Sequence, residues 1–279
     1  MRTRLRPLAR RAVARAFALG TEGRDGLRIL TYHRVNGTHP RDRLSVRPDA
    51  FAAQMELLAR SGRPVIPLAQ APALLHGEGP RARGAVAITF DDGFADNFEV
   101  ALPILGRFGF PATFFIATGY VGSDRTLDRY RDCCADDPVL SWDEVRGLRD
   151  RGHEIGGHGR THRELGALAP EDARAEIDGC ALDIEASTGT RPRLFCYPRG
   201  SETPDTRRLV AETGFLAACT VRPGANHAGD DLLGLARTEV SGDDDAEDFR
   251  LKLAGGFDGW HRLRQRVHAW RGRTAHEER

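Results

Sequence analysis

The sequence has almost no surplus of charge, because 41 basic side chains stand against 40 acidic ones among 279 residues, a formal net charge of +1. A protein that coats nucleic acid needs many uncompensated cations, so we expect no nucleic-acid partner. The 31 glycines and 15 prolines are too few for a disordered or collagen-like chain. The length suits one large α/β domain or two small ones.

Cysteine is scarce, and the five that occur form no C-x-x-C pair. This pattern indicates neither a disulfide scaffold nor a structural zinc knuckle. Long apolar runs are also missing, since no stretch approaches the ~18 residues of a membrane-spanning helix. The first residues are positively charged, as in a signal peptide, but Arg10, Arg11 and Arg15 interrupt the apolar stretch. We therefore expect reduced thiols and a cytoplasmic protein, with a twin-arginine signal as the weaker alternative.

From Leu27 onward, short β-branched or aromatic runs alternate with amphipathic stretches, which predicts parallel strands joined by helical crossovers. The expected strands are 28–32, 65–66, 85–90, 112–117, 153–155, 194–197, 216–220 and 232–240. A capping box at Ser141 and Glu144 predicts one of the helices, and Pro170 and Pro204 begin two others. About seven β/α units at this spacing predict an α/β barrel.

Both ends of the chain are basic and amphipathic. Leu5, Leu8 and Phe17 lie among arginines, and Trp260 and Trp270 recur at helical spacing among further arginines. One interpretation is peripheral membrane contact through anionic lipid. The favoured alternative is a pair of helices that pack their aromatic side chains on the barrel and leave the arginines in solvent. The expected divisions are a basic N-terminal extension (1–26), the barrel (27–255) and a basic amphipathic C-terminal helix or tail (256–279).

Polar residues follow several expected strands, where barrel enzymes carry their catalytic groups. Asp91 and Asp92 follow strand 85–90, and adjacent carboxylates point to different sides, so one can bind a cation while the other acts as a base. Alone, an Asp-Asp-Gly segment is more often a helix cap and turn. His158 and His162 have the H-x-x-x-H spacing, which predicts two imidazoles on one side of a helical turn. With a carboxylate they would form a metal set of the catalytic type, although such pairs also arise by chance.

Two further strand ends carry candidates. The segment Tyr197–Gly200, which reads YPRG, predicts a tight turn whose backbone N–H groups can serve as oxyanion donors. His33 follows the apolar segment Ile29–Tyr32. A lone histidine there is usually structural, but a zinc hydrolase needs a proton donor for its leaving group, and histidine suits that role near neutral pH.

Three of these segments together resemble the polysaccharide deacetylases, the NodB-like family also called carbohydrate esterase family 4. Thr89–Gly93 (TFDDG), Gly157–His162 (GHGRTH) and Tyr197–Gly200 (YPRG) occur in the order of the family's first three motifs. The resemblance covers most of the span from Leu27 to Val240. It implies a distorted (β/α) barrel, a divalent metal, usually zinc, and hydrolysis of an N-acetyl group on a hexosamine in a saccharide.

The resemblance also implies roles for individual residues. Asp91 corresponds to the family's catalytic base and Asp92 to its metal-binding carboxylate. His158 and His162 correspond to the two imidazole ligands. The backbone N–H of Arg199 corresponds to the oxyanion donor.

The sequence departs from the family's pattern in three places. Cys196 stands where the third motif often begins with an arginine that orients the base. Arg199 stands where the family usually has an aromatic residue. The last expected strand lacks the motif that carries the family's general-acid histidine. Ile29–His33 resembles that missing motif, as in a circularly permuted branch that includes enzymes acting on poly-N-acetylglucosamine, so His33 is the expected general acid. Arg237 is a candidate replacement for the missing arginine, with a surface ion pair as the alternative.

The expected function is metal-dependent removal of an N-acetyl group from a hexosamine in a polysaccharide, an oligosaccharide or a lipid-linked saccharide precursor. One alternative is removal of a formyl or ester-linked acetyl group, since an activated water attacks amide and ester carbonyls alike. Another is a non-catalytic saccharide-binding module. The Arg199 guanidinium would suit an anionic saccharide, although a solvent-facing turn arginine is the alternative. The sequence leaves the oligomeric state open.

Overall fold

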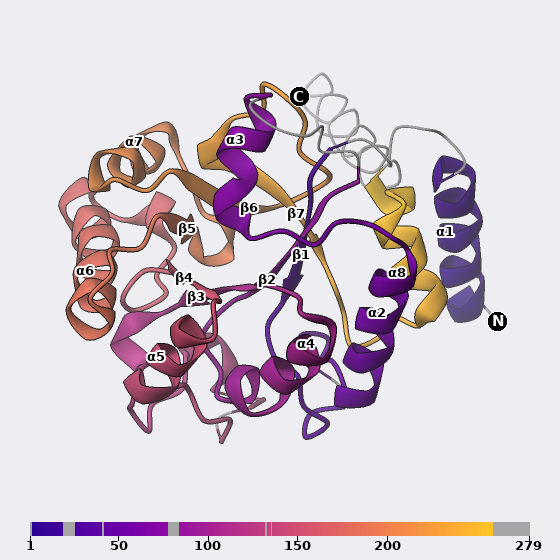
Figure 1. The fold of residues 1–279 in the computed structure, drawn as a ribbon, viewed down its shortest axis with the longest axis horizontal. Coiled ribbons are helices and arrows are strands. Elements are labelled where there is room, and N and C mark those ends of the chain that lie inside the picture. The colour runs from indigo at the N-terminus through magenta and orange to yellow at the C-terminus, as the bar shows by residue number, and fades with distance from the viewer. Residues whose placement is uncertain are drawn as a thin grey trace, which may run out of the picture.

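Seven parallel strands close into a barrel with helices around it (Figure 1). The computed structural model describes residues 2–18, 26–40, 42–77, 84–131, 133–134 and 136–258, without the side chains of residues 2–9 and 129. The strands are β1 (Arg28–Tyr32), β2 (Val86–Phe90), β3 (Thr113–Ile116), β4 (Glu154–Gly157), β5 (Leu194–Cys196), β6 (Ala217–Pro223) and β7 (Leu235–Glu239). The distorted α/β barrel that the sequence predicts is confirmed.

Strand β1 closes the barrel, because Leu30 pairs with Ile88 of β2 on one side and with Thr238 of β7 on the other. The expected strand at 65–66 is wrong, since Val65 makes only an isolated bridge to Val86. Prolines at positions 64 and 67 lack the N–H that a longer ladder would need.

The helices cover the outside of the barrel, and their ends follow the local sequence. They are α1 (Arg2–Ala18), α2 (Pro48–Arg60), α3 (Ala71–Leu75), α4 (Leu102–Phe108), α5 (Trp142–Asp150), α6 (Pro170–Thr188), α7 (Pro204–Thr213) and α8 (Ala246–Leu253). The capping box of Ser141 and Glu144 begins α5 as expected. A π-helical turn, Asn97–Ala101, precedes α4. Pro103 cannot donate the bond that would continue a regular helix through this turn.

The N-terminal helix α1 packs against α8. Arg11 forms ion pairs with Asp245 and Asp248, at 2.7 and 2.6 Å, while Phe17 is 45% exposed. The expectation that aromatic side chains pack inward is therefore wrong for Phe17. The C-terminal segment with Trp260 and Trp270 lies outside the described residues. Within the described part of the chain, no helix is both long and apolar enough to cross a membrane.

Candidate active site

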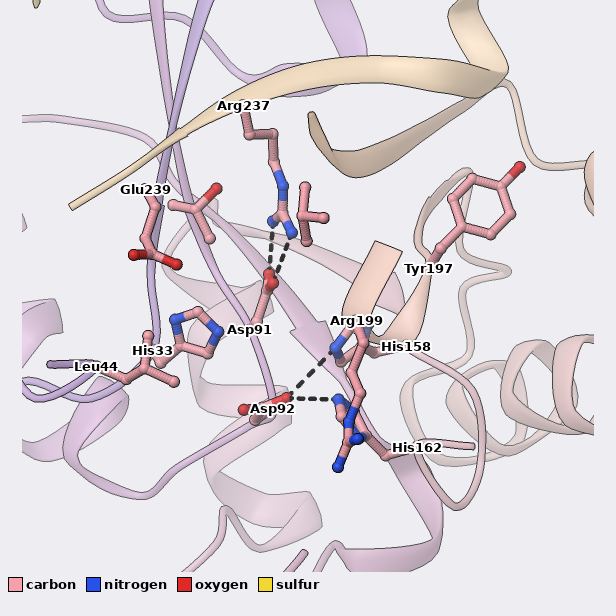
Figure 2. Close-up of a pocket in the computed structure, with 12 residues that line it drawn as sticks. His33, Leu44, Asp91, Asp92, His158, His162, Tyr197, Arg199, Arg237 and Glu239 are labelled. Carbon is pink, nitrogen blue, oxygen red and sulfur yellow. Dashed lines mark hydrogen bonds and ion pairs between the residues drawn. The ribbon is translucent and has the colours of Figure 1, made fainter. Parts of the chain in front are cut away.

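The polar residues from the strand ends meet in one cavity of about 540 Å³ (Figure 2). Because all strands are parallel, their carboxyl ends lie at the same mouth of the barrel. The lining residues are Thr31, His33, Leu44, Asp91, Asp92, His158, His162, Tyr197, Arg199, Val221, Arg237 and Glu239. Every site residue that the sequence analysis named is among them.

Asp92 faces two imidazoles in this cavity. Its Oδ1 atom lies 3.3 Å from Nε2 of His158 and 3.2 Å from Nε2 of His162 (Figure 2). All three side chains are buried. One carboxylate oxygen and two imidazole nitrogens within 4.8 Å of one another form a donor set that a divalent ion can share.

The hydrogen bonds around His158 indicate a place for a cation. Its Nδ1 lies 2.7 Å from the carbonyl oxygen of Cys196, which can only accept, so Nδ1 carries a hydrogen. In the neutral ring, Nε2 then presents a lone pair to Asp92 Oδ1, a buried oxygen without a hydrogen-bond partner. Two acceptors face each other at this distance only with a positive charge between them, either a proton or a metal ion. The donors therefore fit a divalent metal.

The pKa values respond to the same arrangement. Burial by itself raises the pKa of Asp92, but His162 and His158 outweigh it and hold that pKa well below its ordinary value. For His158 burial has the opposite effect and by itself lowers the pKa, but Asp92 and Asp91 outweigh it and raise the pKa. The two carboxylates thus favour a positive charge on the His158 ring itself.

The loop that carries the two histidines is not helical, so the helical turn expected from H-x-x-x-H is wrong. His162 has a φ of 58° and Gly159 a φ of 70°. The N–H groups of Arg160 and Thr161 donate to the Glu176 carboxylate of α6, both at 2.8 Å, instead of to carbonyls of a helical turn. A side chain of α6 therefore holds this loop open and brings His162 to Asp92.

Tyr130 holds the Asp92 carboxylate in place, a contact that the sequence did not predict. Its hydroxyl donates to Asp92 Oδ2 at 2.5 Å, so the phenol occupies one oxygen while Oδ1 faces the imidazoles. Tyr130 comes from the long segment between β3 and α5, which shows no periodicity that would have revealed its contact with Asp92. No sequence signal pointed to this residue.

Asp91 is held by a different partner. Nη1 and Nη2 of Arg237 each donate to one of its oxygens at 2.7 Å, and both side chains are almost fully buried. The pair is therefore not a surface ion pair. Burial by itself raises the pKa of Asp91, but the Arg237 guanidinium outweighs it and leaves the pKa below its ordinary value.

Cys196 occupies the space beside this pair. Its Sγ lies 3.0 Å from Nη2 of Arg237 and 3.6 Å from Asp91. Arg237 also donates through Nε to the carbonyl of Thr220 at 2.9 Å. A guanidinium from β7 thus reaches the carboxylate that an arginine at position 196 would otherwise approach from β5.

His33 and Arg199 complete the cavity wall. His33 is buried at the end of β1. Arg199 lies in the tight turn Pro198–Gly200 with a φ of 54°, so the turn expected from YPRG is present. The Arg199 guanidinium is half exposed and pairs with Glu164 at 2.9 Å.

Comparison with known proteins assigns the chain to a family. A family model described as polysaccharide deacetylase matches residues 78–218, just over half of the chain. The chain belongs to the polysaccharide deacetylase family. The family resemblance drawn from the three motifs is thereby confirmed.

Three relatives illustrate the similarity. YxkH of Bacillus subtilis (strain 168), which carries a polysaccharide deacetylase name, is 26% identical over 79% of this chain and 74% of its own length. The poly-beta-1,6-N-acetyl-D-glucosamine N-deacetylase of Escherichia coli (strain K12) is 27% identical over 48% of this chain, but the match covers only 20% of that enzyme. The structure of IcaB from Ammonifex degensii shares the fold, with a TM-score of 0.70 and 24% identity over 83% of this chain and 97% of that one.

Proposed function

We propose that this polysaccharide deacetylase is a metal-dependent enzyme that hydrolyses the N-acetyl group of a hexosamine in a saccharide. The observation that carries the proposal is the meeting of Asp92, His158 and His162 in one cavity, with Asp91 beside them and not among them. An ion-binding set and a separate carboxylate are what metal-assisted hydrolysis requires.

Asp92, His158 and His162 are the residues that would hold the metal. Two imidazole nitrogens and one carboxylate oxygen leave positions open for water and substrate, and this donor set suits zinc. Bound there, a divalent cation would polarise the acetyl carbonyl and make a water more acidic. Tyr130, which donates to Asp92 Oδ2, keeps Oδ1 turned toward the imidazoles.

Asp91 acts as the general base. Its paired guanidinium keeps the carboxylate ionised at neutral pH, so it can take the proton of the attacking water. In this proposal Arg237 is a positioning residue, because it acts on the reaction only through Asp91. The position of its Nη atoms fixes both carboxylate oxygens at once.

Arg199 would stabilise the tetrahedral intermediate, and His33 would assist its breakdown. In the turn, the N–H groups of Gly200 and Ser201 already donate to the carbonyls of Tyr197 and Pro198, which makes the N–H of Arg199 the candidate oxyanion donor. His33 shares the cavity with Asp91 and would donate a proton to the departing amine.

The proposed substrate is an oligosaccharide or polysaccharide with N-acetylglucosamine units, including a lipid-linked precursor. The name of the Escherichia coli relative supports this class. An O-acetyl esterase or a deformylase on the same scaffold is the second candidate, since the same groups would attack those carbonyls.

The test is acetate release from N-acetylglucosamine oligomers by the zinc-loaded protein, beside an O-acetylated saccharide and an N-formylated analogue of the same length. We expect acetate from the N-acetyl substrate and at least a 10²-fold loss in Asp91→Asn, as for removal of a general base. Turnover of only the ester or only the formyl substrate would show that the enzyme is an esterase or a deformylase instead. No turnover by the metal-loaded protein on any of the three would contradict hydrolysis.

A further inference from the structure

A second group of metal-ligand atoms lies outside the cavity. His39 comes from the loop after β1, whereas Cys134 and Asp137 come from the segment between β3 and α5. Their ligand atoms all lie within 4.8 Å of one another, and His39 Nε2 is 2.8 Å from Asp137 Oδ1. The Sγ atom of Cys133 lies 3.0 Å from that of Cys134. None of these residues lines the cavity of the proposed active site.

We propose that His39, Cys134 and Asp137, with Cys133 as the fourth donor, form a second metal site that takes a thiophilic divalent cation such as zinc. Imidazole, thiolate and carboxylate are the ligands that zinc uses, and four protein donors make a closed, structural site. Bond lengths of about 2.0 to 2.3 Å place tetrahedral ligand atoms roughly 3.3 to 3.8 Å apart. The ligand atoms of His39, Cys134 and Asp137 lie within 4.8 Å of one another, so small side-chain shifts would bring these three to that spacing, and Cys133 would have to turn its Sγ toward them.

Arg34 orients the carboxylate of this site. Its Nη1 lies 3.2 Å from Asp137 Oδ2, which leaves Oδ1 on the side of His39. The guanidinium is fully buried and is also paired with Asp42, so a carboxylate outside the site balances its charge. Outer partners that fix a ligand in this way are typical of metal sites.

The two thiols differ in exposure. Cys134 is buried, whereas Cys133 is exposed and gives an ion a route in from solvent. When a metal binds, each S–H bond is replaced by a sulfur–metal bond, and one proton per thiol leaves to solvent.

The site would tie the β1 loop to the segment that carries Tyr130. Arg34 stacks on the Tyr130 ring at 4.3 Å, and Tyr130 in turn donates to Asp92. An ion at His39, Cys134 and Asp137 would therefore steady a wall of the cavity without touching the substrate. The inference does not rest on the proposed function, because none of its ligands is one of the proposed catalytic or metal-binding residues.

Cobalt(II) titration of the full, reduced chain tests the proposal. A thiolate ligand gives cobalt an intense near-ultraviolet charge-transfer band, and the site of Asp92, His158 and His162 has no thiolate. We expect two metal equivalents per chain and such a band in the wild type. Cys134→Ser should lose the band and one equivalent, and so should His39→Ala, which alters a partly exposed loop residue and leaves the buried core unchanged.

Three controls separate this site from the first. Asp92→Ala should lose one equivalent and keep the band. Cys180→Ser, which removes another buried thiol, should keep both equivalents. A wild type without the band would overturn the proposal. So would a band that survives Cys134→Ser but disappears in Cys196→Ser, because Cys196 lies beside Asp91 and His158.

Discussion

Replacing Arg237 by methionine would leave Asp91 as an uncompensated charge inside the barrel. The arginine and the carboxylate have side-chain exposures of 3% and 4% and share two hydrogen bonds of 2.7 Å. Removing one partner of a buried pair costs about 3 to 5 kcal/mol of the free energy of unfolding. That is a large share of a total stability of about 5 to 15 kcal/mol.

The same substitution should change the pH dependence of the reaction. Without the guanidinium, burial is the largest remaining influence on Asp91, and burial raises its pKa. The base would then be ionised only at higher pH, so the acidic limb of the kcat/KM profile should move upward. Urea unfolding followed by circular dichroism and a pH series of acetate release would measure the two effects.

Two further variants make this prediction specific. The double variant Asp91→Asn/Arg237→Met should be more stable than Arg237→Met, because no unpaired charge remains. Arg208→Met, which breaks exposed ion pairs with Asp205 and Glu212 on α7, should leave the unfolding midpoint unchanged. A loss below about 1 kcal/mol in Arg237→Met, with an unchanged pH profile, would refute the reasoning, since that is the range of a surface pair.

Three other substitutions test single residues that line the cavity or contact one of its lining residues. His33→Ala should lower kcat by about 10²- to 10⁴-fold with the metal retained, because the departing amine loses its proton donor; full turnover would remove His33 from the mechanism. Tyr130→Phe should weaken zinc binding by about 10- to 100-fold in equilibrium dialysis, since Asp92 loses the donor that orients it; an unchanged Kd would show that the hydroxyl is dispensable. Arg199→Ala should reduce kcat/KM more for acidic than for neutral saccharides if its guanidinium binds an anionic group, and equal losses on both would end that hypothesis.

The fold and the metal-site candidates could be predicted because they follow from local patterns. Alternating strand and helix signals define the barrel, and polar residues directly after a strand must lie at its carboxyl end. Asp91, Asp92 and His158 were found in this way. His33, which directly follows β1, was found by the same reasoning.

The remaining features depend on contacts between distant segments. The non-helical loop at His162 is set by Glu176, which lies on the following helix, and its conformation could not be read from the H-x-x-x-H spacing. The sequence alone could not show that Arg237 points into the barrel, because this direction depends on how β7 pairs with β1 and β6. Tyr130 and Cys134 lie in a segment without periodicity, so only the folded chain shows that one reaches Asp92 and the other is buried.

The most direct test of the account is the zinc content of Asp92→Ala and Asp91→Asn after equilibrium dialysis, measured beside acetate release. The account predicts that Asp92→Ala binds one equivalent less than the wild type and is inactive. It predicts that Asp91→Asn keeps the wild-type metal content and still loses at least 10²-fold in the rate of acetate release. Full metal content in Asp92→Ala, or loss of an equivalent in Asp91→Asn, would contradict the division between a metal ligand and a base.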